Sequence, residues 1–207
     1  MKNVEQLFER EQKAQEIKSN ERTMKCFILY VGLFFMVWVL NTIGFFQMEQ
    51  WLVTFSFLIV AVSSCVASLI YHVSNKYSPW VKYVLLFLVC VFSSAVNALL
   101  SVHAILLFAV PLVFAVQYVN RGVMWFSYFA NLICMGISSM VSFYYGICDL
   151  NILFESNHTR DWYMEHYVDG ALQIMPNANQ TFIVLGFSVV PKGIVLLAFT
   201  FMLHYLM

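Results

Sequence analysis

Apolar residues in this chain form long uninterrupted runs, and polar residues gather in the segments between them. Runs of this kind predict transmembrane helices, because a helix needs about 20 residues to cross the hydrocarbon core of a bilayer. The run ILYVGLFFMVWVL at 28–40 shows no alternation of polarity, so it does not fit a strand of a membrane β-barrel. The pattern therefore predicts an all-α, polytopic membrane protein.

Six spans follow from these runs. The first covers residues 26–46, the second 51–72 and the fifth 123–146. The stretch 82–119 is too long for one helix and suits two short ones, with the break expected where small and polar residues cluster in SSAVNALLSVH, at 97–101. The last run, TFIVLGFSVVPKGIVLLAFTFMLHYLM, supplies the sixth span.

Two segments lie outside the predicted membrane domain, which covers residues 26–207. Residues 1–25 contain no Pro or Gly and are rich in Glu, Lys and Gln, which predicts a polar helix that we expect to be solvated beside the membrane. Residues 147–180 form the other sizeable polar segment, which we place on the outer side.

The distribution of charge predicts the orientation. Cytoplasmic loops carry an excess of Lys and Arg. With both termini in the cytoplasm, nine of the eleven basic residues fall inside: Lys2, Arg10, Lys13, Lys18, Arg22, Lys25, Lys76, Lys82 and Arg121. The acidic residues Glu49, Asp149, Glu155, Asp161, Glu165 and Asp169 then fall outside. We therefore expect a multi-pass protein of the plasma membrane.

Composition agrees with a membrane protein and disfavours several kinds of functional site. The 207 residues are 61% hydrophobic and 11% charged, against about 25% charged in soluble domains. The five cysteines form no CxxC pair, which disfavours a zinc or redox motif. No phosphate-binding loop, catalytic dyad or nucleic-acid patch is present. We expect no enzyme activity within this chain, no cofactor and no nucleic-acid partner; the bilayer is the expected partner.

Few polar groups occur inside the predicted spans. No Asp or Glu lies between Gln50 and Cys148, and none follows Asp169. Ion-coupled transport usually requires ionisable groups along an internal pathway, so the sequence disfavours it. The remaining polar candidates are Asn41, Asn97, His103, Asn131 and Lys192.

Two of the functional candidates lie in the predicted fourth span. His103 reads either as a ligand or proton sensor, or as an interfacial histidine bonded to Asn97 or to a lipid headgroup. Pro111 cannot donate a backbone hydrogen bond to Leu107 and is expected to kink the helix, as a hinge or for packing.

The segment VVPKG, at 189–193, allows two placements of the last span. In the first, Pro191 begins a short final helix and Lys192 reaches the outer headgroups. In the second, the helix spans about 182–204, Pro191 is a kink within the membrane, and Lys192 faces the bundle interior near Asn97 or Asn131. We favour the first placement.

The outer segment contains a weak candidate for a metal site. His158, Asp161, Glu165 and His166 are close in sequence, and the last three have spacings that bring side chains together on a helix. No established ligand motif is present, so solvated residues of an interfacial helix are the favoured interpretation.

The order of these parts carries a resemblance. A charged helix precedes six short spans, the middle contains His103-Ala-Ile-Leu-Leu-Phe-Ala-Val-Pro111-Leu, and the last span begins at Pro191-Lys192. This layout resembles the multi-pass membrane sensor regions of bacterial, clostridia-like signalling proteins that end in GGDEF diguanylate cyclase or sensor kinase domains. The resemblance implies a sensory or regulatory membrane domain whose last helix relays a signal to an output domain beyond Met207.

Other functions fit the same pattern less specifically. A small transporter or channel subunit and a membrane scaffold are the alternatives that the sequence leaves open. A homodimer through the last helix is possible for a sensor domain, and the sequence does not identify a small-molecule ligand.

Overall fold

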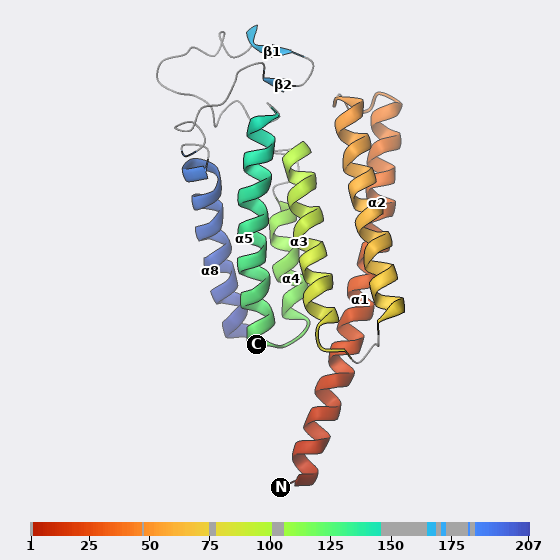
Figure 1. Cartoon of the computed structure of the whole chain (residues 1–207), viewed down its shortest axis with the longest axis vertical. Coiled ribbons are helices and arrows are strands. Elements are labelled where there is room, and N and C mark those ends of the chain that lie inside the picture. The colour runs from red at the N-terminus through yellow and green to blue at the C-terminus, as the bar shows by residue number, and fades with distance from the viewer. Residues whose placement is uncertain are drawn as a thin grey trace.

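The computed structural model describes residues 2–46, 48–74, 78–100, 106–145, 165–168, 171–172, 182 and 185–207 (Figure 1). The helices are α1 (Lys2–Thr42), α2 (Gln50–Val73), α3 (Val81–Leu100), α4 (Val110–Val116), α5 (Arg121–Tyr144) and α8 (Val190–Leu206). A π-helical turn, η3 (Leu185–Val189), leads directly into α8. Two short strands, β1 (Tyr167–Val168) and β2 (Ala171–Leu172), pair antiparallel.

The prediction of long apolar α-helices is confirmed, whereas the six membrane spans stay a prediction. Among the described residues, four helical segments are long and apolar enough to cross a membrane: Arg10–Thr42, Gln50–Val73, Val81–Leu100 and Arg121–Tyr144. Two further apolar helices, Leu106–Val116 and Val190–Leu206, are shorter. The expected break after the third run is also present, because α3 ends at Leu100.

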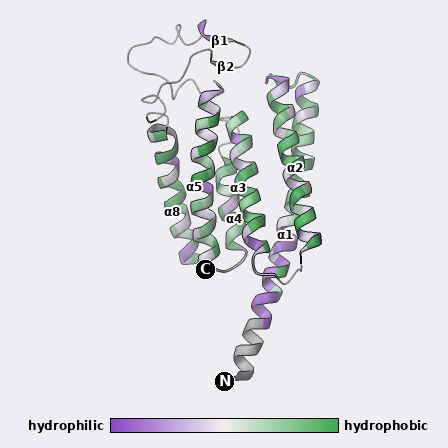
Figure 2. Cartoon of the chain, in the orientation of Figure 1, coloured by the Kyte–Doolittle hydropathy of each residue, from purple (hydrophilic) through white to green (hydrophobic). Residues whose placement is uncertain are grey.

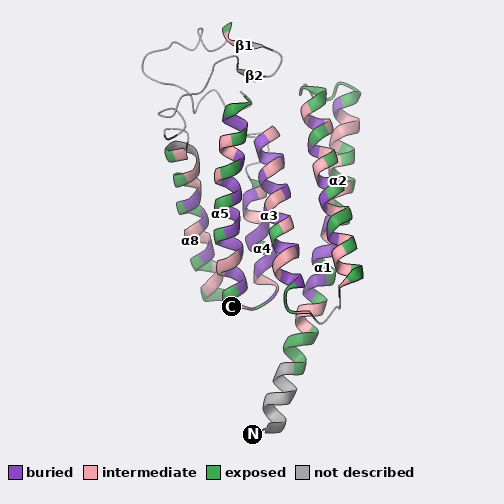
Figure 3. Ribbon diagram, in the orientation of Figure 1, coloured by how far each residue is buried: buried purple, intermediate pink, exposed green. Residues whose placement is uncertain are grey.

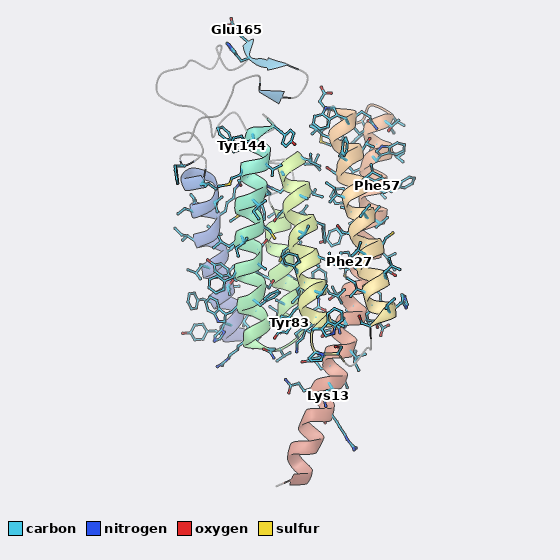
Figure 4. All side chains as sticks on the ribbon, in the orientation of Figure 1. Lys13, Phe27, Phe57, Tyr83, Tyr144 and Glu165 are labelled. Carbon is cyan, nitrogen blue, oxygen red and sulfur yellow. The ribbon has the colours of Figure 1, made fainter. Side chains whose placement is uncertain are left out.

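The polar arm and the first span form one helix. We expected a boundary near residue 25, but α1 continues from Lys2 to Thr42 with no interruption. The coloured part of α1 that projects beyond the bundle is hydrophilic, whereas the bundle helices are mostly apolar on their visible faces (Figure 2). Lys13 points away from the bundle on the projecting part (Figure 4).

Both chain ends lie at the same end of the bundle (Figure 1). We call this the arm end; it contains the start of α3 at Val81, the start of α5 at Arg121 and the end of α8 at Leu206. The opposite, far end contains the end of α1, the start of α2 and the end of α5 at Tyr144 (Figures 1 and 4).

Helix α3 is the centre of the bundle and packs against α1, α2, α4 and α5. Its buried apolar residues, among them Leu85, Leu86 and Val89, join Phe27 of α1 and Val60 of α2 in the main core. Buried residues recur along the length of α3, with Phe87 exposed among them, while outward faces of α1 and α2 are exposed (Figure 3). An exposed apolar face of this kind suits a lipid environment.

Candidate functional site

Two short helices, α4 and α8, each contain a proline as their second residue. Pro111 lies in the first turn of α4 and Pro191 in the first turn of α8. A first-turn proline loses no intrahelical hydrogen bond, because the first N–H groups of a helix have no partner within it. Both short helices pack against α5. Both short helices therefore have the same neighbour, α5.

Polar side chains of α5 bind the backbone where these short helices begin. Ser127 Oγ donates to the carbonyl of Pro111 at 3.0 Å, and Asn131 Nδ2 donates to the carbonyl of Phe108 at 2.7 Å. Tyr128 Oη donates to the carbonyl of Gly193 at 3.4 Å. Interrupted helices are tolerated at membrane depth where neighbouring groups satisfy the freed backbone. We call this region the helix junction.

Lys192 lies at the helix junction. Its Nζ is 5.9 Å from the centroid of the Phe108 ring, which suits a cation–π contact. The next residue, Gly193, packs so closely against α5 that an added Cβ would lie 2.9 Å from Leu132 Cδ1. Because Leu132 is in the middle of α5, Lys192 lies well away from both ends of that helix.

The structure can be compared with the two sequence-based placements of VVPKG. Pro191 is the second residue of α8, which begins at Val190 and ends at Leu206. Lys192 nevertheless lies against Phe108, whose carbonyl binds the buried Asn131. The depth of the lysine in a bilayer stays a prediction.

The structure describes only some of the other predicted site residues. Asn97 is buried on α3, and its Oδ1 has no hydrogen-bond partner in the described part of the chain. His103 lies outside the described residues. Of the proposed metal ligands, only Glu165 and His166 are described, whereas His158 and Asp161 are not. Within the described ranges, no group of three or more His, Cys, Asp or Glu residues is placed to hold a metal.

A second polar cluster, at the arm end, was missed from the sequence. Tyr118, in the turn between α4 and α5, donates to Asn20 Oδ1 at 2.8 Å. Ser19 Oγ donates to the carbonyl of Gln117 at 2.8 Å, and Thr23 Oγ1 lies 3.4 Å from Tyr118 Oη. We call this set, together with the Glu16–Lys82 ion pair described next, the arm clamp.

The arm clamp includes an ion pair shielded from solvent. Lys82 Nζ, at the start of α3, lies 2.5 Å from Glu16 Oε1. The two side chains are 7% and 20% exposed, respectively. An ion pair so far removed from water is screened less than a surface pair. The arm is therefore held against the bundle by polar contacts, where the sequence favoured a solvated helix.

The environment of Tyr118 favours its neutral form. Burial raises the pKa of its hydroxyl to about 12, the hydrogen bond with Thr23 lowers it, and the Glu16 carboxylate raises it. The residues of the clamp on α1 follow a helical spacing at 16, 19, 20 and 23. That spacing was visible in the sequence, but polar residues at these positions do not by themselves distinguish a buried face from a solvated one.

Comparisons with known proteins identify no relative of this chain. No protein-family model, no curated protein and no solved structure matches the chain.

Proposed function

We propose that this chain is a sensory or regulatory membrane domain with six membrane-embedded segments, in which α8 relays a signal to the cytoplasmic side. The observation that carries the proposal is the attachment of α8. This helix begins at a π-turn and a proline, packs chiefly against α5, and ends at the arm end of the bundle. Interruptions of this kind are common sites of helix bending.

The contrast between α1 and α8 supports a direction for the relay. The arm clamp fixes α1 to α3 and to the turn before α5. Helix α8 is held near its start by the Tyr128–Gly193 hydrogen bond and further along by the contact of Trp125 with Phe201, whose ring centroids are 5.5 Å apart. A stimulus that alters the junction would displace α8 relative to the fixed arm.

Such a relay requires two arrangements of similar free energy that a stimulus populates differently. In the proposed function, one arrangement keeps Gly193 against Leu132, and the other moves α8 away from α5. The resemblance of the layout to bacterial sensor regions supports a diguanylate cyclase or kinase output at the arm end, and a homodimer through α8.

The test measures whether α8 moves relative to the arm. Spin labels are attached at Lys13 and Tyr205, both exposed, through an introduced ketone-bearing amino acid that avoids the native cysteines. Distances are measured in phosphatidylcholine nanodiscs. Gly193→Ala places a methyl group against Leu132 and is expected to shift the distance distribution by about 2 Å, the size of typical helix shifts.

A matched control removes the general effect of a glycine-to-alanine change. Gly136→Ala adds its methyl group where nothing lies within 4 Å, so its distances are expected to equal those of the unmodified chain. If Gly193→Ala leaves one narrow distance unchanged, α8 is rigidly fixed and the relay is wrong.

One observation favours a second candidate, a small transporter. Transporters often bind substrates where discontinuous helices begin near the middle of the membrane, and α4 and α8 both begin beside α5 at the helix junction. The absence of Asp and Glu from residues 50–148 argues against ion coupling. Uptake of a small organic cation or anion into liposomes that contain only this protein would establish transport and replace the sensory proposal.

A further inference from the structure

One exposed face of α1 changes from basic to apolar along its length. Lys18, Arg22 and Lys25 lie on this face, which we call the basic stripe, and Leu29 and Met36 continue it. Their spacings of 4, 3, 4 and 7 residues keep all five on one side of a helix. All five are exposed, Leu29 by 60% and Met36 by 57%. Because α1 is one unbroken helix, the basic and apolar parts of the face share one orientation.

The arm clamp fixes the direction in which the basic stripe points. Ser19, Asn20 and Thr23 make contacts of the clamp and are buried on the other side of α1. A rotation that turned the stripe toward the bundle would break these contacts and expose Phe27, which is 1% exposed. The basic stripe therefore faces outward from the bundle, in the same direction as Leu29.

The same clamp contacts place the basic stripe at the arm end of the bundle. Ser19 binds the carbonyl of Gln117 and Asn20 binds Tyr118, and both partners lie in the turn before α5. Helix α5 is long and apolar enough to cross a membrane, so its beginning marks the level at which the bundle meets the lipid headgroups. The residues of the stripe surround positions 19 and 20 in sequence and lie at this level.

The stripe keeps a net positive charge. Glu21 is the one acidic residue between Lys18 and Lys25 in the sequence, and it pairs with Lys25 at 2.8 Å. The two side chains of this pair are 53% and 72% exposed. Exposed ion pairs contribute little, so Lys25 can exchange the carboxylate for a phosphate. Lys18 and Arg22 form no ion pair with another described residue.

We propose that the basic stripe binds the headgroups of anionic phospholipids in the leaflet at the arm end. The acyl chains pack along Leu29 and Met36, and the phosphate groups meet the three cations. Lys18 lies about 10 Å from Lys25 along the helix axis, close to the Debye length of about 8–10 Å, so all three cations act on one headgroup layer. The guanidinium of Arg22 can bind a phosphate through two hydrogen bonds.

The face suits other partners less well. A second copy that packed against it in parallel would bring like charges together. A soluble acidic partner would match the cations but would leave the apolar part of the same face uncovered. The inference goes beyond the proposed function, because it depends neither on the relay by α8 nor on the side of the membrane that the arm end occupies.

The test compares two photoreactive lipids on the full chain in phosphatidylcholine nanodiscs. One is a phosphatidylglycerol and the other a phosphatidylcholine, each with a diazirine near the carbonyl end of one acyl chain and each added at the same trace level. Mass spectrometry maps the labelled peptides. One basic residue near an anionic surface strengthens binding about five-fold, so we expect phosphatidylglycerol to label residues 26–36 at least about five times more than phosphatidylcholine. High salt is expected to reduce this ratio.

Two double variants remove the same charge from different parts of α1. Lys18→Gln with Arg22→Gln removes two cations of the stripe and is expected to lower the labelling ratio to about one. Arg10→Gln with Lys13→Gln removes one exposed Lys and one exposed Arg from the projecting part and is expected to retain the ratio. Lys13 lies about 18 Å from Lys25 along the axis, beyond the Debye length. Circular dichroism checks that each variant is folded.

Each other outcome contradicts the inference in its own way. Equal labelling by the two lipids shows that the face does not select anionic headgroups. Equal loss of the ratio in both double variants assigns the selectivity to net charge and not to the stripe. Cross-linked dimers through α1 in place of lipid labelling show that a second copy covers this face. If the variant at Lys18 and Arg22 does not fold, the salt dependence of the ratio in the unmodified chain decides: a ratio that high salt leaves unchanged overturns the proposal.

Discussion

The Tyr118 hydroxyl donates a hydrogen bond of 2.8 Å to Asn20 Oδ1 across 98 positions of the chain. Tyr118 is 2% exposed and Asn20 is 3% exposed, so the two side chains are shielded from water and hydrogen-bond to each other instead. This contact joins the polar part of α1 to the turn before α5. A polar arm is thereby made part of the folded bundle.

The hydrogen bond between Tyr118 and Asn20 is expected to contribute measurably to stability. Tyr118→Phe leaves the Asn20 oxygen without its donor, and a buried acceptor left unsatisfied costs about 1–3 kcal/mol. Chemical unfolding in detergent micelles measures the change, and hydrogen exchange of residues 15–24 is expected to increase. Tyr205→Phe, at a side chain 87% exposed, is the matched control and is expected to change neither. Equal stability of the two variants would show that the contact contributes nothing.

The pKa of Tyr118 predicts a loss of stability in strong alkali. Burial raises this pKa to about 12 from its ordinary value of 10.0, so the unfolded chain loses the proton first as pH rises. The stability linked to this group is therefore complete below pH 10 and decreases from pH 10 to about 12. The melting temperature in detergent, measured across that range, is expected to fall more steeply for the unmodified chain than for Tyr118→Phe. Parallel slopes would assign the alkaline sensitivity to other groups.

The two ion pairs of α1 provide a comparison of a shielded pair with an exposed one. Lys82 and Glu16 are 7% and 20% exposed, whereas Lys25 and Glu21 are 72% and 53% exposed. Loss of Lys82 leaves a carboxylate with little water, so Lys82→Met is expected to cost about 2 kcal/mol.

The control for the ion pair is on the same helix. Lys25→Met is expected to cost less than about 1 kcal/mol, because exposed ion pairs contribute little. Added salt is expected to reduce the contribution of Lys25 more than that of Lys82. Unfolding in detergent at two salt concentrations measures both effects. A larger cost for Lys25→Met would contradict the assignment of the clamp.

The apolar runs predicted the long helices because the length of a membrane helix is set by the bilayer. The expected span 51–72 is α2 at Gln50–Val73, and 123–146 is α5 at Arg121–Tyr144. In the structure, α5 begins at Arg121, where the Asn120 side chain accepts from the backbone N–H groups of Gly122 and Val123. These features depend on residues that are close in sequence, so the local sequence pattern is sufficient to predict them.

The sequence did not predict features that depend on distant residues. Nothing in the sequence indicates that Tyr118 lies beside Asn20. Lys192 allowed two placements because the sequence does not show that Phe108 and Leu132 lie against the start of α8. The continuity of α1 through residue 25 was missed for a different reason: the change from polar to apolar composition marks an environment and not the end of a helix.

Asn131 is expected to fix the start of α4 at the helix junction. It is fully buried, and its Nδ2 donates to the Phe108 carbonyl at 2.7 Å, while its Oδ1 has no partner in the described ranges. Asn131→Leu removes the hydrogen bond but also removes an unsatisfied acceptor, so the net cost is expected to be about 1 kcal/mol. Hydrogen exchange is expected to increase in α4, at residues 112–116, and much less in α3.

The control and the result that would contradict this prediction both concern the hydrogen bond between Asn131 and Phe108. Ser138→Ala removes a hydroxyl bonded within its own helix, to Met135, and is expected to leave exchange in α4 unchanged. Asn131→Leu tests whether this residue has a structural role. If it only positions α4, its loss increases exchange in α4 and leaves the sign of any transport or signalling response unchanged. If α4 exchanges at the same rate in both variants, the hydrogen bond to Phe108 does not position α4, and packing of Leu112 and Met135 alone holds the junction.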